Sequence, residues 1–519
     1  MEPLALTFDL GTQSLRAVLV DPTGAIVSYV QKKFERTYVS PKPGQAEQDA
    51  DFFWHAITSA SRELKEKSGA DWERIVCVSL TTVRDSIVLI DKNGVPVRPL
   101  ILWLDKRETE LAPLSFKDRA IFAAVGMTKA VELTRKISAV NYLRQCEPEN
   151  YARADKVVFL STYLNMKLCG HVVDSTASVI GHLPYDNKNR RWLTPRDRNY
   201  VIFPVEREKL ADLVEPGEVM GTITTKCAQE TGIKEGLPLI ATGSDKACET
   251  IGLSCTTPEK AAVSFGTTAT ISYTIDRYIE PQRFFPSYAS PIRGHYHPEI
   301  QIYRGYWLIN WFKKEFAEKE VKEAHALGIS AEDLLNQRLK EIPPGSNGLV
   351  FQPYFTPNFS MPNTRGAVIG FSEVTTRIHL YRAIIEGINF ALMEGAFSLE
   401  KRMKTKTEGI YVAGGGSRSR EICQITADMF GLPLYRAQSH ETGVIGSAAV
   451  AFQSVGVYET VEDAIEKMVH IKEIFTPNMK NHAVYMRLYN EVFEKIFKKL
   501  KPLYETAKAY ESSDRESLF

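Results

Sequence analysis

The sequence predicts an α/β protein with two related halves and a cleft between them. First, apolar runs at residues 4–9 and 15–20 flank a Gly-Thr turn near the N-terminus. Second, apolar runs at residues 261–265 and 269–273 flank another Gly-Thr turn, about half a chain length later. Third, a chain of 519 residues is long enough for two or more domains, each with a core of its own. The economical division is 1–252 and 253–519.

The first elements are expected to be strands followed by a helix. A third apolar run at residues 25–30 follows the turn at 21–24, so residues 4–30 predict a three-stranded antiparallel meander. Between residues 53 and 67 the apolar side chains recur three or four positions apart, which predicts an amphipathic helix.

A third glycine-rich turn lies in the second half. Residues 410–413 predict a strand that reaches Gly414, Gly415, Gly416 and Ser417, and a helix is expected over 420–430. A strand that delivers glycines to a helix N-terminus suits phosphate or nucleotide contact, because backbone N–H groups can approach the ligand closely. Apolar spacing over 485–500 predicts a packed terminal helix, with a polar tail from about residue 507.

Composition excludes several classes of protein. Lys and Arg total 64 and Asp and Glu total 63, for a net charge of +1, which argues against a strongly basic nucleic-acid binder. Seven cysteines without a C-x-x-C pair argue against a disulfide or zinc framework, and the histidine spacing predicts no transition-metal site. The N-terminus lacks a targeting pattern and no run of about 18 apolar residues occurs. We therefore expect a soluble cytoplasmic protein without nucleic-acid or membrane partners.

The Gly-Thr turns carry the first chemical signal. Asp9 ends the first strand beside the turn that contains Thr12, and such a carboxylate can hold a metal-bound water near nucleotide phosphates. The alternative is that Asp9 only caps its turn. The second turn, at Gly266 and Thr267, favours the phosphate interpretation, because two such turns facing one cleft are the parts of an actin-like ATPase core. No G-x-x-x-x-G-K-[ST] pattern is present, so the P-loop class is excluded.

Asp245 is the candidate general base. It follows the apolar run 237–241 near the boundary of the halves, where a substrate hydroxyl could meet the γ-phosphate. The alternative is an N-cap for a helix that begins near Ala247.

Two further groups suggest a polyhydroxylated ligand. Arg84 with Asp85, and Trp103 with Asp105, each end an apolar segment and combine donors, acceptors and an aromatic wall. Each group could equally form a salt bridge at a loop.

Together these residues resemble the FGGY family of carbohydrate kinases over about residues 4–480. The resemblance depends on the order and spacing of several pieces: Asp9-Leu10-Gly11-Thr12 with Ser14 and Arg16; residues 44–49; residues 103–107; Asp245; Phe265-Gly266-Thr267-Thr268; residues 366–371 with His379, Ala383 and Glu386; and Gly414-Gly415-Gly416-Ser417.

The resemblance implies two ribonuclease-H-like domains, each a mixed sheet flanked by helices, with the active site in the cleft between them. ATP and Mg²⁺ are the implied cofactors, with Asp9 holding the magnesium ion through water and Asp245 acting as the base. The implied nucleotide contacts are Thr12, Gln13, Ser14 and Arg16 near the phosphates, Gly266, Thr267 and Thr268 around the β and γ phosphates, and Gly414, Gly415, Gly416 and Ser417 beside the adenosine.

The substrate residues resemble several branches of that family. Residues 44–49 and 160–164 resemble the xylulokinases, but Arg84-Asp85 stands where a Met-His-Gly tripeptide is expected and is closer to the Arg-Glu pair of glycerol kinases. Residues 14–18 and Arg84 are similar to the autoinducer-2 kinases. Lys246 replaces a neutral residue, so its cation could contact a sugar hydroxyl, an acidic substrate or the base.

The predicted function is ATP-dependent phosphorylation of a small sugar or polyol, with a ketopentose of the xylulose or ribulose type as substrate and direct in-line transfer as mechanism. The expected substrate contacts are Arg84, Asp85, Trp103, Asp105, Asp245 and Lys246. A glycerol, polyol or autoinducer-2 kinase remains an alternative. An actin-like ATPase and a non-catalytic sugar sensor are rivals of another class, and a homodimer is left open.

Overall fold

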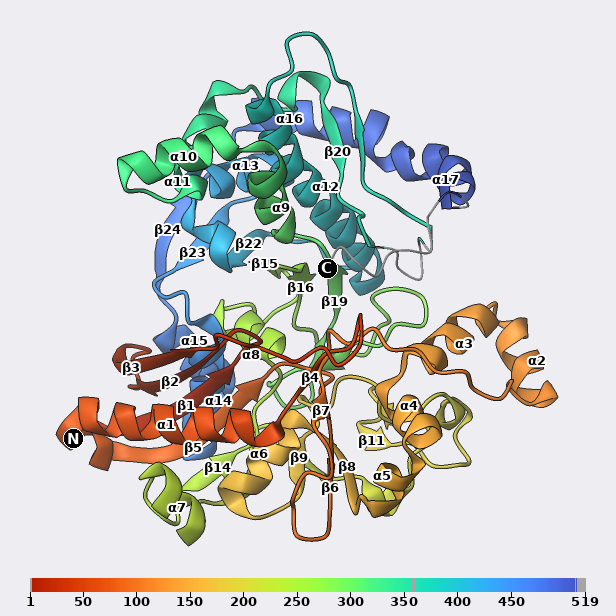
Figure 1. Cartoon of the computed structure of the whole chain (residues 1–519). Helices are drawn as coiled ribbons and strands as arrows, with labels where there is room; N and C mark the ends of the chain where they lie inside the picture. Colours follow the sequence, from red (N-terminus) through yellow and green to blue (C-terminus); the bar gives the residue numbers. More distant parts are fainter. Residues whose placement is uncertain (1, 357–360, 362, 509, 511–519) are drawn as a thin grey trace.

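A computed structural model describes residues 2–356, 361, 363–508 and 510 of the chain. Within this part, two six-stranded mixed sheets form the centres of the two halves (Figure 1). The first sheet has the order β13 (Val219–Thr222), β14 (Pro238–Ile240), β5 (Ile75–Thr82), β1 (Leu4–Leu10), β2 (Ser14–Val20), β3 (Ile26–Lys33). The second has the order β19 (Glu299–Ile302), β16 (Ala269–Ser272), β15 (Lys260–Phe265), β22 (Gly409–Ala413), β23 (Leu434–Ala437), β24 (Ile471–Phe475).

The two sheets have the same topology. In the first, β1, β2 and β3 pair antiparallel while β5 and β14 run parallel to β1. In the second, β15, β16 and β19 pair antiparallel while β22 and β23 run parallel to β15. Each sheet ends in an antiparallel edge strand, β13 or β24. The predicted repeat and the N-terminal meander are therefore confirmed, and the two Gly-Thr turns occupy equivalent positions in the two sheets.

Helices cover one face of each sheet. Alternate side chains of β1, such as Leu6 and Phe8, face the core that contains α1 (Ala50–Ser68) and α6 (Leu160–Cys169), as the period of two requires. The second sheet packs on α12 (Arg377–Met403), α13 (Arg420–Phe430) and α9 (Trp307–Phe316). The helices expected over 53–67 and 420–430 are confirmed as α1 and α13.

The opposite face of the first sheet is covered by one helix from the middle of the chain and two from its last quarter. Ala5 of β1 packs in one cluster with α8 (Asp245–Gly252), α14 (Thr442–Ser454) and α15 (Val461–Met468). A Cβ on Gly446 would lie 2.0 Å from the carbonyl oxygen of Cys248, so α8 and α14 cross in backbone contact. The division at residues 252 and 253 stays a prediction, and α14 with α15 crosses it in space (Figure 1).

The remaining elements surround these layers. A small sheet in the first half has the order β4 (Glu47–Gln48), β7 (Leu100–Ile101), β6 (Ile87–Ile90), β8 (Lys156–Phe159). The strand pairs are β9 (Val173–Ser175) with β12 (Asp212–Val214), β10 (Tyr185–Asp186) with β11 (Arg191–Trp192), β17 (Tyr288–Ala289) with β18 (Tyr296–His297), and β20 (Val350–Gln352) with β21 (Ala367–Ile369). The other helices are α2 (Phe116–Ala124), α3 (Thr128–Ile137), α4 (Ala139–Cys146), α5 (Pro148–Arg153), α7 (Thr225–Thr231), α10 (Glu318–Leu327), α11 (Ala331–Arg338), α16 (Met479–Leu488) and α17 (Glu494–Lys508).

The predicted terminal helix is confirmed as α16 and α17, joined by a π-helical turn at Tyr489–Phe493. Most of the predicted polar tail lies outside the described residues. Among the residues that are described, no helix combines the length and the apolar character needed to cross a membrane.

Candidate active site

The first Gly-Thr turn connects β1 to β2. Its backbone closes through the Gly11 N–H, which donates to the carbonyl of Ser14 at 2.9 Å. The indole of Trp103 donates to the hydroxyl of Thr12 at 3.0 Å, so a predicted substrate residue and a predicted phosphate residue touch each other. A cavity of about 530 Å³ runs beside the turn and is lined by Gln13 and Arg16, among others.

The second Gly-Thr turn connects β15 to β16 and is held by the start of α9. The N–H of Tyr306 donates to the carbonyl of Gly266 at 3.0 Å, and the N–H of Trp307 donates to that of Thr267 at 3.3 Å. The hydroxyl of Thr268 donates to the carbonyl of Tyr303 at 3.3 Å. These bonds fix the turn at the end of β15.

The glycine-rich turn after β22 lies against the second Gly-Thr turn. Gly414 has a φ of +82°, and a Cβ there would lie 2.7 Å from the carbonyl carbon of Phe265. A Cβ on Gly416 would lie 2.4 Å from the ring of Tyr306, whereas Gly415 borders open space. The hydroxyl of Ser417 closes the turn on the carbonyl of Gly414 at 2.7 Å. The structure therefore brings these two predicted nucleotide turns together.

Asp9 lies at the centre of an acidic group. It pairs with Arg16 at 3.1 Å, and the Nε of Arg16 lies 2.9 Å from Glu441, just before α14. Burial raises the pKa of Asp9 to about 6, because Arg16 offsets burial only in part while Asp245, Glu441 and Glu249 add to the rise. Carboxylates thus outnumber cations around Asp9, as is favourable for binding a further cation.

Asp245 is the first residue of α8, and Ser244 occupies the N-cap position. The interpretation of Asp245 as the N-cap of a helix beginning near Ala247 is therefore wrong, because the helix starts two residues earlier. Its Oδ1 accepts a bond from the Lys246 N–H at 2.8 Å and lies 3.8 Å from the Nε of Arg84. Burial raises the pKa of Asp245, while Arg84 and Lys246 act in the opposite direction.

Arg84 reaches from the first half of the chain to the second. It follows β5, and its Nη2 donates to Glu299 on β19 at 3.1 Å. Its guanidinium also lies over the ring of Tyr288, 5.7 Å from the centroid. The Nη1 atom is buried and has no hydrogen-bond partner among the described residues. Arg84 thus keeps one donor group without a partner among the described residues, while its Nε lies near Asp245.

The side chain of Asp85 is occupied by contacts with the loop that contains His182. Its Oδ1 accepts from the backbone N–H of His182 at 2.8 Å, and its Oδ2 lies 2.8 Å from the imidazole Nδ1 of the same residue. Burial lowers the pKa of His182, but the charge and hydrogen bond of Asp85 outweigh burial, so the pKa is raised overall. The φ of +54° at Asp85 is a strained backbone conformation that these contacts stabilise.

The side chain of Asp105 is also occupied by hydrogen bonds within the protein. Its side chain is only 4% exposed and accepts bonds from the N–H of Ala46 at 2.6 Å and from the Nε of Arg107 at 2.7 Å. Trp103, by contrast, is 45% exposed. Direct sugar contact by Asp85 and Asp105 stays a prediction, and their geometry supports positioning of the neighbouring loops.

Lys246 links the two halves a second time. Its Nζ lies 2.8 Å from the hydroxyl of Ser264 on β15 and 2.9 Å from Glu249 on its own helix. Because Ser264 comes just before the second Gly-Thr turn, this contact ties the N-terminus of α8 to that turn.

Sequence reasoning missed Glu299, Glu441, His182 and Ser264. The first begins β19, in which polar Glu299 and Gln301 alternate with Ile300 and Ile302, so the sequence gives no clear signal that Glu299 is buried. Its partner Arg84 is 215 residues away, so no local spacing connects the two.

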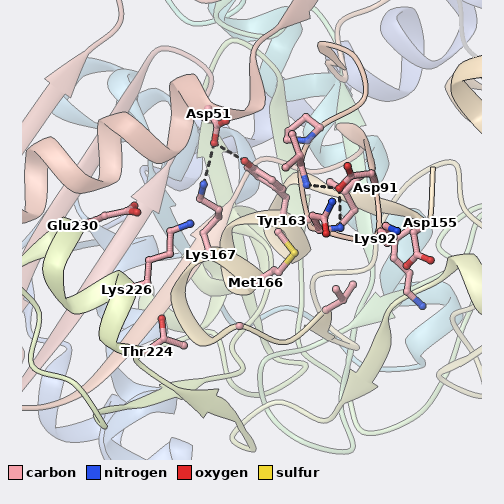
Figure 2. Close-up of a pocket in the computed structure, with 18 residues that line it drawn as sticks. Asp51, Asp91, Lys92, Asp155, Tyr163, Met166, Lys167, Thr224, Lys226 and Glu230 are labelled. Carbon is pink, nitrogen blue, oxygen red and sulfur yellow. Dashed lines mark hydrogen bonds and ion pairs between the residues drawn. The ribbon is translucent and has the colours of Figure 1, made fainter. Parts of the chain in front are cut away.

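A second cavity, of about 500 Å³, lies apart from the predicted residues (Figure 2). Asp51 points toward Tyr163 and Lys167, with which it forms bonds of 2.5 and 3.1 Å. Glu230 accepts a bond from the indole of Trp54. The lining carboxylates Asp51 and Glu230 thus have partners within the protein, and the cavity contains none of the predicted site residues.

Two family models match separate parts of the chain. The model of the N-terminal domain of the FGGY family of carbohydrate kinases matches residues 4–252, and the model of its C-terminal domain matches residues 261–455. The chain belongs to this family.

Relatives align over nearly the whole kinase. The xylulose kinase of Lactococcus lactis is 27% identical over 500 residues, which covers 95% of this chain and 96% of that protein. The uncharacterized sugar kinase YgcE of Escherichia coli is 28% identical over 492 residues, which covers 94% and 92%. The solved structure of a gluconate kinase from Lactobacillus acidophilus superposes with a TM-score of 0.82 at 23% identity and covers 98% of this chain and 100% of that one. This likeness confirms the predicted α/β fold of two domains with mixed sheets.

Proposed function

We propose that this carbohydrate kinase transfers the γ-phosphoryl group of ATP to a hydroxyl of a ketopentose of the xylulose or ribulose type. One observation carries the proposal. Asp245 and Arg84, whose Nη1 has no partner among the described residues, lie together where the two halves meet, and the charge of Asp245 contributes to the raised pKa of Asp9. The similarity to a xylulose kinase over almost the full length supports the substrate class.

Asp245 is proposed to accept the proton of the attacking hydroxyl. A general base works best when its pKa is raised toward the working pH, and burial has that effect on Asp245. Arg84 and Lys246 counteract burial and favour the ionised carboxylate, which is the form that can accept a proton. The transfer is direct and in line, so it needs no phospho-enzyme.

Arg84 is proposed to bind the sugar through its free Nη1. A buried donor without a partner costs about 1–3 kcal/mol, and a sugar hydroxyl would remove that cost. Trp103 offers an exposed aromatic surface, and Lys246 offers a cation next to Asp245. Asp85 and Asp105 complete the proposed substrate region, chiefly through the loops that they hold.

ATP is the phosphoryl donor that the family implies, and we propose its contacts as follows. Thr12, Gln13, Ser14 and Arg16 lie near the phosphates, Gly266, Thr267 and Thr268 bind the β and γ phosphates, and Gly414, Gly415, Gly416 and Ser417 border the adenosine. The open space beside Gly415 supports the last assignment.

Asp9 fits a magnesium ion. Among the described residues no three His, Cys, Asp or Glu side chains gather closely enough to ligate a metal directly. A single carboxylate together with waters and phosphate oxygens is, however, a usual Mg²⁺ environment. Burial raises the pKa of Asp9, Arg16 offsets this only in part, and three neighbouring carboxylates add to the rise, so a further cation would be favourable here. A bound magnesium ion would neutralise charge on the phosphates. We place the enzyme in the cytoplasm, where its seven free cysteines stay reduced.

The test is a screen of ADP release with pentuloses, hexuloses, polyols and sugar acids. We expect the highest kcat/KM with a ketopentose, and ³¹P NMR should show a sugar phosphate as the product. A higher kcat/KM with a sugar acid or polyol would show that the proposed substrate class is wrong. ATP hydrolysis that is equally fast without any acceptor would refute the kinase assignment.

A further inference from the structure

The guanidinium of Arg84 lies between two carboxylates but contacts them unequally. Its Nη2 is 3.1 Å from Glu299, whereas its Nε is 3.8 Å from Asp245. Hydrogen bonds between charged nitrogen and oxygen are usually about 2.7–2.9 Å long, so the contact with Glu299 is a hydrogen bond whereas the contact with Asp245 is too long to be one. Arg84 therefore hydrogen-bonds Glu299 and makes only a long ion pair with the candidate base.

Burial explains why the guanidinium hydrogen-bonds Glu299 and not Asp245. The side chain of Glu299 is 1% exposed, while that of Asp245 is 29% exposed and retains contact with water. A buried carboxylate needs a cation more than a hydrated one does. Glu299 also accepts a hydrogen bond from Gln301 and lies 3.5 Å from the Nε2 of His297. Burial raises the pKa of Glu299, but Arg84 and His297 lower it by more than burial raises it. The pKa of Glu299 therefore lies well below its usual value.

We infer that Glu299 is a positioning residue of this site, which holds the Arg84 guanidinium away from Asp245 and so leaves that carboxylate free to accept a proton. The inference rests on the proposed role of Asp245 as the base. A carboxylate that is hydrogen-bonded to arginine is a weaker base, because the ion pair favours its ionised form. Glu299 lies on β19 of the second half, so it can hold Arg84 away from Asp245 only when that strand lies beside Arg84.

The other charged groups around Asp245 do not replace this role. Asp245 faces Lys246 and Glu249 from its own helix, Arg84 from the loop after β5, and Asp9 from β1. The Nζ of Lys246 is occupied by Glu249 and by Ser264 at 2.9 and 2.8 Å. Glu299 also acts on Lys246 through its charge, but it is Arg84 that hydrogen-bonds Glu299.

The first test is a crystal structure of the Glu299→Gln variant. Glutamine has the shape of glutamate but no charge, so we expect Arg84 to move to Asp245 and form an ion pair of about 2.7–2.9 Å. An Arg84 that stays at the wild-type separation of 3.8 Å overturns the inference. This readout needs no activity, so it decides the inference even if the wild type phosphorylates no sugar, a result that would remove only the proposed function.

The second test is the pH dependence of kcat with the best acceptor. In Glu299→Gln we expect kcat to fall about tenfold, with the KM for ATP unchanged within about twofold. The acidic limb of the profile should move to lower pH, because the new ion pair lowers the pKa of Asp245. A merely structural role would leave this limb in place, so an unmoved limb contradicts the inference.

Two controls separate the Glu299 effect from the general loss of a buried charge. Glu320 is likewise 1% exposed and pairs with Arg377 at 3.0 Å, so Glu320→Gln should leave the acidic limb where it is. In an Arg84→Ala background, Glu299→Gln should add no further shift, because it acts through Arg84. A full additional shift there overturns the inference.

A second variant, Glu299→Asp, covers the possibility that Glu299→Gln does not fold. It keeps the charge but withdraws the carboxylate toward β19, so we expect a smaller shift of the limb in the same direction and an Arg84 closer to Asp245. If Glu299→Asp matches the wild type in both readouts, the inference fails.

Discussion

Substitution of Asp245 by asparagine tests the proposed chemistry most directly. The side-chain oxygen of asparagine can still accept the Lys246 N–H bond, which is 2.8 Å long in the wild type. Ser244 keeps the N-cap position, so α8 should retain its start. What disappears is the ability of the side chain to accept a proton from the substrate.

The expected loss is that of a general base, which contributes about 10²–10⁴-fold to kcat, or about 3–5 kcal/mol of activation free energy. ATP binding should persist, because the proposed nucleotide contacts come from the turns after β1, β15 and β22. Steady-state kinetics with a coupled ADP assay gives kcat, and isothermal titration calorimetry gives the ATP affinity. A folded variant that retains more than about a tenth of the wild-type kcat would refute the assignment.

Stability provides the control for this experiment. Burial raises the pKa of Asp245, so at pH values above the folded-state pKa its ionisation opposes folding. Asparagine cannot ionise, and we expect a Tm at pH 7 that equals or exceeds that of the wild type. A loss of activity accompanied by a lower Tm would point to misfolding instead of lost base catalysis.

Three further predictions concern other parts of the site. Arg84→Ala should lower kcat/KM for the sugar by a factor equivalent to about 1–3 kcal/mol, with the KM for ATP nearly unchanged. An unchanged kcat/KM for the sugar would mean that the sugar pocket lies elsewhere. Asp9→Asn should stabilise the ligand-free protein by up to about 3 kcal/mol above pH 6. The folded-state pKa of Asp9 is raised from 3.8 to about 6, so this advantage should grow between those pH values and be absent below them; denaturant melts at several pH values check it. Gly446→Ala should lower the free energy of unfolding by at least about 1–3 kcal/mol, because the added Cβ would lie 2.0 Å from a backbone oxygen. Gly443→Ala on the same helix, where the nearest atom is 3.7 Å from the added Cβ, should not destabilise the protein. Equal Tm values for the two variants would contradict the close crossing of α8 and α14.

Much of the fold could be predicted from local patterns. The strands on both sides of the two Gly-Thr turns, the helices α1 and α13, and the repeat of the two halves all follow from alternation, helical spacing and turn residues. The expected helix start near Ala247 is two residues later than the observed start of α8 at Asp245, because serine and aspartate both favour the N-cap position and stand next to each other here.

By itself, the sequence determined the elements, their repetition and the residue types available for phosphoryl transfer, since these depend on neighbours a few positions apart. Which charges meet depends on how distant segments pack. Arg84 pairs with Glu299 across 215 residues, Arg16 pairs with Glu441, and α14 from the end of the chain covers the first sheet. These contacts depend on how the two sheets and their helices pack, and on burial, which determines the carboxylate that holds a shared guanidinium.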